Sequence, residues 1–90
     1  MKYVLRYTMA PGADMARIRE LFPAHREHWG AYQADGTLVA IGPMENLADG
    51  ALAVFTERDA AERFAAADPF VTGGLVGSWD VTGWREALLG

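Results

Sequence analysis

The chain has 90 residues, a net charge of −4 at pH 7 and no cysteine, which predicts a single small domain, residues 1–90, that buries about 60% of the surface its unfolded chain exposes. Its hydrophobic content of 51% excludes a disordered tail, and the lack of a Lys/Arg cluster argues against nucleic acid or an anionic membrane as a partner. Without cysteine there are no disulfides, thiolate metal sites or Cys nucleophiles, and without a signal-peptide or membrane-spanning run we expect a cytoplasmic protein.

The first part of the chain predicts a strand followed by a helix. Large apolar or aromatic residues occupy every second position of Lys2–Met9, which is the period of a strand. Asp14–Leu21 reads as a helix, but Phe22 precedes a proline and is therefore disfavoured in the α region. We expect the helix to break or kink there, with Pro23 opening a second helical piece that reaches Ala34.

Two strands are predicted in the middle of the chain. Thr37–Ile41 is β-branched and aliphatic and stops at Gly42-Pro43, and Ala51–Phe55 is a second apolar run. The segment Met44–Gly50 between them is long for a hairpin, so we interpret it as either a mobile flap or a loop that covers something.

A second helix and a fourth strand complete the predicted fold. Thr56, with Asp59 three residues later, approximates a capping box ahead of apolar residues at helical spacing. We expect this helix to end by Asp68, because Pro69 follows it. The range Leu75–Thr82 then alternates between two faces, which indicates a strand.

The resulting order β-α-β-β-α-β predicts an α+β fold of the ferredoxin-like type. In this arrangement both helices cover one face of a four-stranded antiparallel sheet, and the other face has no cover. We expect large apolar groups on both faces of the first and fourth strands, so that the open face packs on a second copy. The sequence thus predicts a homodimer with a pocket between helix and sheet.

One histidine and one carboxylate form a candidate acid-base unit. His25 lies on the first predicted helix, and Asp68 lies where the second must stop. An imidazole titrates near neutral pH, and a neighbouring carboxylate can fix its tautomer. At helical spacing, His28, Trp29 and Tyr32 share an arc of about 100° with His25. Both histidines and two aromatic side chains are therefore candidates to face one pocket.

Three segments of the chain carry motifs that occur together in one protein family. They are a histidine on the first helix, a Gly-Pro that ends the second strand, and an Asp-Pro-Phe turn. In this sequence they read His25-Arg26-Glu27-His28-Trp29, the range from Tyr32 to Pro43, and Ala66-Ala67-Asp68-Pro69-Phe70-Val71. In this order they resemble the YCII-related (YciI-like) family, and the resemblance extends from Tyr3 to Trp84.

This resemblance implies a dimeric α+β barrel built from ferredoxin-like protomers, with a catalytic His-Asp pair in a pocket. Carried onto this sequence, the family histidine falls on His25 and the family aspartate on Asp68, with His28 as a competing histidine. The substrate-binding candidates are His28, Trp29, Tyr32, Gly42, Pro43 and Phe70. The two aromatic residues of the first helix would give the pocket a wall suited to a planar or aromatic ligand.

Each candidate also has a structural interpretation. The histidines fit the polar border of a buried helix face, an Asp-Pro turn often ends a helix, and the aromatic candidates fit a core or a dimer interface. The glycine and proline fit backbone turns. The spacing His25-x-x-His28, with Asp68 as a third ligand, is compatible with a metal. No further histidine pair or local carboxylate completes that set, so we predict neither metal nor cofactor.

The function predicted is a cofactor-free enzyme that acts on a small aromatic or enolisable substrate. His25 would move a proton and Asp68 would hold the imidazole, which suits an isomerase or a lyase that eliminates halide or water. The alternative is a non-catalytic dimeric ligand-binding or accessory domain. An interaction protein without a pocket is a third hypothesis, and it predicts a helix packed flat on the sheet beside His25.

Overall fold

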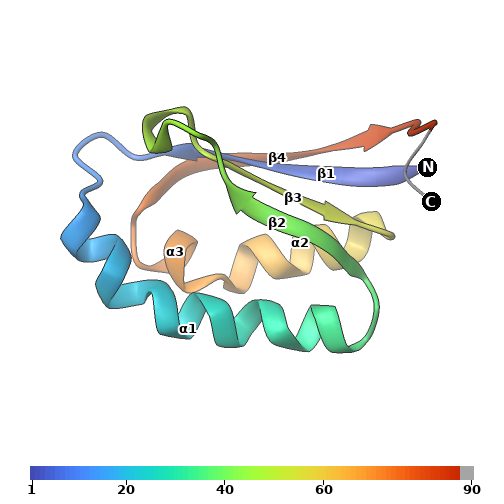
Figure 1. Ribbon diagram of the computed structural model, residues 1–90, viewed down its shortest axis with the longest axis horizontal. Coiled ribbons are helices and arrows are strands. Elements are labelled where there is room, and N and C mark those ends of the chain that lie inside the picture. The colour runs from blue at the N-terminus through green and yellow to red at the C-terminus, as the bar shows by residue number, and fades with distance from the viewer. Residues whose placement is uncertain (88–90) are drawn as a thin grey trace.

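The structure is a computed structural model that describes residues 1–87, so the last three residues of the predicted domain lie outside the described residues. A four-stranded antiparallel sheet forms one layer, and the helices form a second layer against one of its faces (Figure 1). The elements in chain order are β1 (Lys2–Met9), α1 (Met15–Ala34), β2 (Leu38–Pro43), the 3-10 helix η1 (Leu47–Asp49), β3 (Ala51–Phe55), α2 (Arg58–Ala67), α3 (Pro69–Thr72) and β4 (Val76–Trp84).

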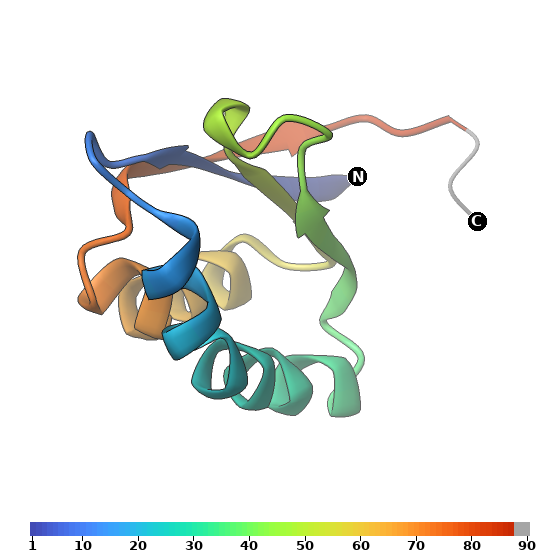
Figure 2. The same ribbon diagram turned by 60° about the vertical axis from the view of Figure 1, so that its left-hand side comes forward.

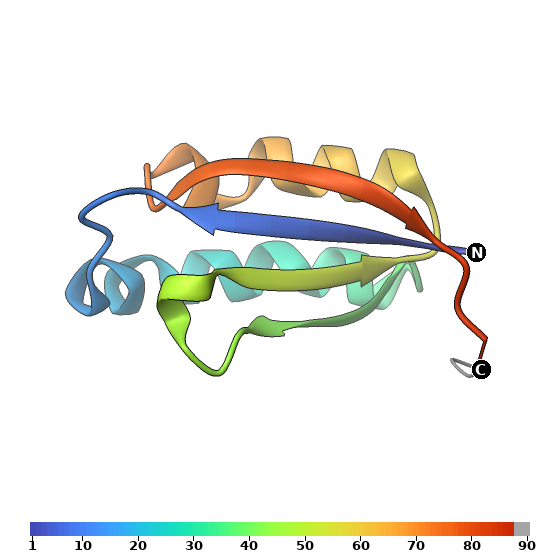
Figure 3. The same cartoon turned by 90° about the horizontal axis from the view of Figure 1, so that it is seen from above.

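The ferredoxin-like topology predicted from the sequence is confirmed. The strands lie in the order β2-β3-β1-β4, and every neighbouring pair is antiparallel. Seen from above the sheet, α1 runs on the side of β3, while α2 and α3 lie on the side of β4 (Figure 3). The short helix α3 is an addition that the sequence pattern did not reveal. None of the helices within residues 1–87 combines the length and the apolar character needed to cross a bilayer.

The first helix is continuous through Pro23, where the sequence predicted a break or a kink; of these two alternatives, the break is not formed. Asp14 caps α1 by accepting a hydrogen bond of 2.8 Å from the N–H of Arg17, and the helix runs through Pro23 to Ala34. A proline removes one helical N–H and crowds the preceding turn. The face that carries buried His25 packs against α2 and α3, and this packing holds the chain helical on both sides of the proline. The first turns of α1 are inclined to the remainder (Figure 1), as a proline within a helix would produce.

The predicted capping box of the second helix is not formed. Glu57, rather than Thr56, is the N-cap of α2, and its side chain makes no capping bond. Asp59 instead pairs with Arg63 at 2.8 Å on the exposed side of the helix. Burial holds α2 in place, because its fully buried residues are Ala60, Ala61, Phe64 and Ala65.

The sheet has a buried face and an open face. Leu5 and Tyr7 of β1 are buried on the side of the helices, which places Val4 and Arg6 on the opposite side. The expectation of large apolar groups on both faces of the first and fourth strands is only partly met. Arg6 is paired across the strands with Asp80, at 3.0 Å, and both side chains are exposed. The open face is therefore polar over the middle of β1 and β4.

Gly50 joins the loop after β2 to the central strand. Its backbone has a φ of +92°, in the left-handed region, and its carbonyl accepts a 2.9 Å hydrogen bond from the N–H of Met44. A Cβ at this position would collide with the carbonyl oxygen of Tyr7. Only glycine lets the loop approach β1 this closely.

We expect Gly50→Ala to destabilise the protein more than Gly36→Ala. Both glycines have a left-handed φ, which costs an alanine about 1–2 kcal/mol. Gly36 has open space around the added Cβ, whereas Gly50 meets backbone, which adds about 1–3 kcal/mol of overpacking. Urea unfolding of the two variants measures the difference, and equal losses of stability would contradict the close approach.

Candidate functional site

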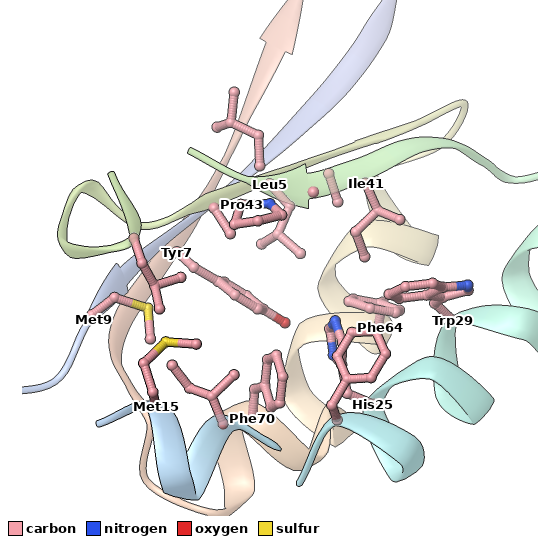
Figure 4. Close-up of a pocket in the computed structure, with 17 residues that line it drawn as sticks. Leu5, Tyr7, Met9, Met15, His25, Trp29, Ile41, Pro43, Phe64 and Phe70 are labelled. Atoms are coloured by element: carbon pink, nitrogen blue, oxygen red, sulfur yellow. The ribbon is translucent and has the colours of Figure 1, made fainter. Parts of the chain in front are cut away.

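A cavity of about 340 Å³ lies between the sheet and α1 (Figure 4). Most of its lining side chains are aliphatic, aromatic or methionine. Tyr7, His25 and Trp29 are the lining residues whose side chains carry nitrogen or oxygen. Because α1 does not pack flat on the sheet beside His25, the structure does not favour an interaction protein without a pocket.

The structure brings His25 and Asp68 together across 43 residues of sequence. His25 Nδ1 lies 2.7 Å from Asp68 Oδ1. Asp68 is fully buried, whereas His25 is 6% exposed and lines the cavity. The carboxylate therefore lies behind the imidazole, which separates it from the cavity.

Local chain geometry explains why Asp68 occupies this position. Its N–H ends α2 by donating to the carbonyl of Ala65, and its side chain caps α3 by accepting a 3.1 Å hydrogen bond from the N–H of Phe70. Pro69 occupies the first position of α3, where its missing N–H costs nothing. The turn between the two helices thus holds the carboxylate inward, toward α1 and β1.

Tyr7 is a member of the site that sequence reasoning missed. Its hydroxyl donates a 2.5 Å hydrogen bond to Asp68 Oδ2, and its ring reaches from β1 into the cavity (Figure 4). Burial, and then the charge of Asp68, raise the pKa of Tyr7 well above its usual range. The one available signal was the alternation of β1, which places Tyr7 on the same face as Leu5.

The hydrogen bonds around Asp68 assign the tautomer of His25. An ionised carboxylate only accepts hydrogen bonds, and this one accepts from Tyr7 and from the N–H of Phe70. The contact with His25 therefore requires Nδ1 to carry a proton. In the neutral imidazole this leaves Nε2 unprotonated, with its lone pair available to a molecule in the cavity.

Aromatic packing fixes the plane of the imidazole. The ring of Phe70 stacks on His25 with centroids 3.9 Å apart and an interplanar angle of 8°. Trp29 meets the imidazole edge-on at 5.2 Å and 87°. His25 is therefore held on its faces as well as at Nδ1, and its orientation is fixed before any ligand enters.

The predicted substrate-binding residues separate into two groups. Trp29, Gly42, Pro43 and Phe70 line the cavity, whereas His28 and Tyr32 do not. Three residues along α1 turn the helix by about 300°, so His28 points to the side of His25. There its Nε2 lies 2.9 Å from the carbonyl oxygen of Phe64 and its ring stacks on Phe64 at 4.7 Å. Tyr32 packs edge-on against the same phenylalanine.

A metal set of His25, His28 and Asp68 is not assembled. His28 is engaged with Phe64 of α2 and does not line the cavity. Within the part of the chain that the structure describes, no three side chains of His, Asp or Glu gather as a metal site would require. The segment Met44–Gly50 contributes Leu47 to the cavity, so it covers part of the cavity.

Comparisons with known proteins agree with this architecture. The model of the YCII-related domain family matches residues 1–85, whereas the sequence matches no functionally curated protein. One similar solved structure is 5-chloro-2-hydroxyhydroquinone dehydrochlorinase from Burkholderia phenoliruptrix, in complex with 2,5-dihydroxybenzoquinone. It is 20% identical, covers 97% of this chain and 96% of its own, and has a TM-score of 0.76.

Two further structures are more distant. SnoaB, a cofactor-independent oxygenase from Streptomyces nogalater, is 18% identical with a TM-score of 0.51, and the alignment covers 99% of this chain and 96% of that one. A protein from Agrobacterium tumefaciens is 19% identical with a TM-score of 0.58 over the same shares of the two chains. At these identities the likeness shows the fold, which is that of the dimeric α+β barrel proteins.

The contact between Tyr7 and Asp68 predicts a pH-dependent stability. Because the pKa of Tyr7 is raised on folding, its contribution to stability is complete below the pKa of an unfolded tyrosine, about 10, and falls at higher pH by about 1.4 kcal/mol per pH unit. The free energy of unfolding of the wild type, minus that of Tyr7→Phe, should shrink accordingly between about pH 10 and 11.

Urea titrations at several pH values measure this difference. Tyr3→Phe is the matched control, because Tyr3 lies on the same strand but packs under the guanidinium of Arg58 and does not line the cavity. If the difference in the free energy of unfolding between wild type and Tyr7→Phe stays constant over this pH range, the pKa of Tyr7 is not raised by folding.

Proposed function

The chain belongs to the YCII-related domain family, and from that premise and the site geometry we propose that it is a cofactor-free enzyme of the lyase or isomerase type. Its substrate would be a small aromatic or enolisable molecule. The observation that carries the proposal is the 2.7 Å contact between His25 and a fully buried Asp68 at the wall of an apolar cavity. This is the arrangement of a general base with its orienting carboxylate.

The proposed step is a proton transfer to His25. Nε2 takes a proton from a substrate hydroxyl or an acidic carbon, and Asp68 stabilises the imidazolium that forms. In an elimination, the electron pair left on the substrate forms the new double bond, and the carbon–halogen or carbon–oxygen bond breaks. The leaving group departs as halide or hydroxide, and the imidazolium then returns its proton to water or to the hydroxide. On a halogenated hydroxyarene, the imidazolium first returns its proton to the ring carbon that bears the halogen. A second hydroxyl then loses its proton, its oxygen forms the second carbonyl of the quinone, and the halide departs from the protonated carbon.

The similar structures support chemistry on a small molecule. One of them is a dehydrochlorinase and another a cofactor-independent oxygenase, and both names describe chemistry on small molecules. The fold therefore accommodates small-molecule chemistry, and the His-Asp pair supplies this chain with a base of its own. Chlorinated hydroxyhydroquinones are accordingly the first compounds to test.

The proposed assembly is a homodimer of single-domain chains in the cytoplasm, formed through the open face of the sheet. Val4 of β1 lies opposite Val54 of β3 on that face, and α1, α2 and α3 all lie on the other side of the sheet (Figure 2). Leu52, opposite Arg6, extends this apolar area along β3. Packing it against a second copy would remove this apolar area from water.

Replacing His25 with Ala should reduce turnover of 5-chloro-2-hydroxyhydroquinone at least about 100-fold, because a general base contributes about 10²–10⁴ to the rate. Release of chloride and appearance of the quinone product measure the rate. Asp68→Asn should also lose rate, since it no longer favours the imidazolium.

His28→Ala is the matched control, because it removes a histidine of the same helix that lies outside the cavity lining. It should keep the wild-type rate. Equal losses in the two histidine variants would contradict the assignment of the base. Binding of the compound without turnover would instead identify a ligand-binding domain.

We expect Val54→Asp to dissociate the dimer, because it places a charge in the apolar part of the open face. Sedimentation velocity of the wild type should show a dimer and that of Val54→Asp a monomer. Ala66→Asp, on the exposed side of α2, serves as the control and should stay dimeric. A monomeric wild type would refute the proposed assembly.

A further inference from the structure

We propose that this cavity selects uncharged hydroxyarenes of a single ring, because it offers hydrogen-bond acceptors to its ligand and no cation. This inference rests on the proposed function and names the substrate class for the same site. The side-chain acceptors are His25 Nε2 and the hydroxyl oxygen of Tyr7. Both side chains donate their hydrogen to Asp68, which lies behind the cavity wall, so each presents a lone pair to the cavity.

The charge of the surroundings excludes an acidic ligand. Within residues 1–87, no Lys, Arg, Asp or Glu lines the cavity. A carboxylate or phosphate that entered would lose its water without gaining a cation, which is costly in an apolar environment. The buried negative charge of Asp68, directly behind His25 and Tyr7, would oppose it further.

The directions of these hydrogen bonds favour a ligand that donates hydrogen bonds to Tyr7 and His25. The hydroxyl hydrogen of Tyr7 is used on Asp68 Oδ2, so a lone pair of its oxygen remains for the cavity. The Nδ1 proton of His25 is likewise used on Asp68 Oδ1, which leaves Nε2 as an acceptor. Figure 4 shows the indole nitrogen of Trp29 at the end of its ring that points away from Tyr7 and His25. A phenolic hydroxyl meets both acceptors, whereas an ether offers them nothing.

The size of the cavity and its lining side chains determine how large the ligand is and which apolar groups it carries. A volume of about 340 Å³ is at the small end for ligand pockets, which suits one substituted ring. Met9, Met15 and Phe70 line it, and thioether and aromatic side chains pack well against a flat ring or a halogen substituent. A halogenated hydroquinone combines these properties with two donor groups and no charge.

This selection also fits the proton transfer. Once His25 has accepted a proton at Nε2, that nitrogen becomes a donor, and it faces the oxygen that has just lost the proton. As the reaction proceeds, His25 Nε2 thus changes from acceptor to donor, while the hydroxyl oxygen of Tyr7 remains an acceptor. The site is matched to a ligand that begins as a donor and ends as an acceptor, as a phenol does when it becomes a quinone.

Calorimetric titration of the wild type with three probes tests the inference under anaerobic conditions at neutral pH. The probes are 2-chlorohydroquinone, its dimethyl ether 2-chloro-1,4-dimethoxybenzene, and the carboxylate 2,5-dihydroxybenzoate. We expect the hydroquinone to bind at least about tenfold more tightly than either of the others, because each of them leaves a buried polar group or a charge unpaired. Equal or tighter binding of the ether or the benzoate would overturn the inference, and so would failure of the hydroquinone to bind at millimolar concentration.

Variants connect the selection to Tyr7. Tyr7→Phe should weaken binding of 2-chlorohydroquinone about tenfold and leave binding of the ether unchanged, because one hydrogen bond is lost. Tyr3→Phe should bind all three probes as the wild type does. If circular dichroism shows that Tyr7→Phe is unfolded, the ranking of the three probes on the wild type decides alone.

The binding series and the turnover assay test the selectivity and the catalysis independently of each other. The expected ranking without turnover would leave the selectivity in place and remove the proposed catalysis. Turnover that depends on His25, with the ranking reversed, would keep the catalysis and overturn the selectivity.

Discussion

The buried carboxylate of Asp68 is the constraint on which the rest of the site depends. A fully buried charge is tolerated only when donors satisfy it, and here the donors come from three separate elements. Tyr7 reaches it from β1, His25 from α1 and the N–H of Phe70 from the start of α3. One side chain therefore ties the sheet, the long helix and the turn after α2 to a single point.

The same geometry explains why this network is better read as a functional feature than as a source of stability. Desolvation of a buried carboxylate offsets most of what its hydrogen bonds contribute, so apolar residues of similar size would serve stability as well or better. A small domain has little stability to spare, yet this one keeps a buried carboxylate and an open cavity side by side. Its polar network fixes the direction of His25, which is a property that a base requires and a core does not.

Sequence periodicity predicted the strands and the two main helices, because alternation and helix-stop signals are local. The pairing of His25 with Asp68, which lie 43 residues apart, was instead implied by the family resemblance. Periodicity did not predict the parts that depend on packing between elements. Pro23 was read as a break or a kink at which a second helical piece begins, whereas packing of the buried face of α1 keeps one helix continuous through it. The contact of Tyr7 with Asp68 joins residues 61 positions apart, and no local pattern reports such a pair. For His28, helical spacing gave the right neighbourhood, but only the structure shows that its ring turns toward Phe64.

The cavity can have apolar walls although the reaction separates charge, because the total charge of the site does not change when the proton moves. With a neutral substrate and a neutral imidazole, the buried site carries the single negative charge of Asp68. Proton transfer turns His25 into an imidazolium and the substrate into an anion, so the new positive charge lies between two negative ones and the total is unchanged. Attraction between opposite charges is strong where water is excluded, so the cavity can be apolar without opposing the reaction. An anionic substrate would lose this balance before the proton moves, because it adds a second negative charge while His25 is still neutral. The position of Asp68 behind His25 and Tyr7 thus determines both how the base acts and which molecules the cavity can accept.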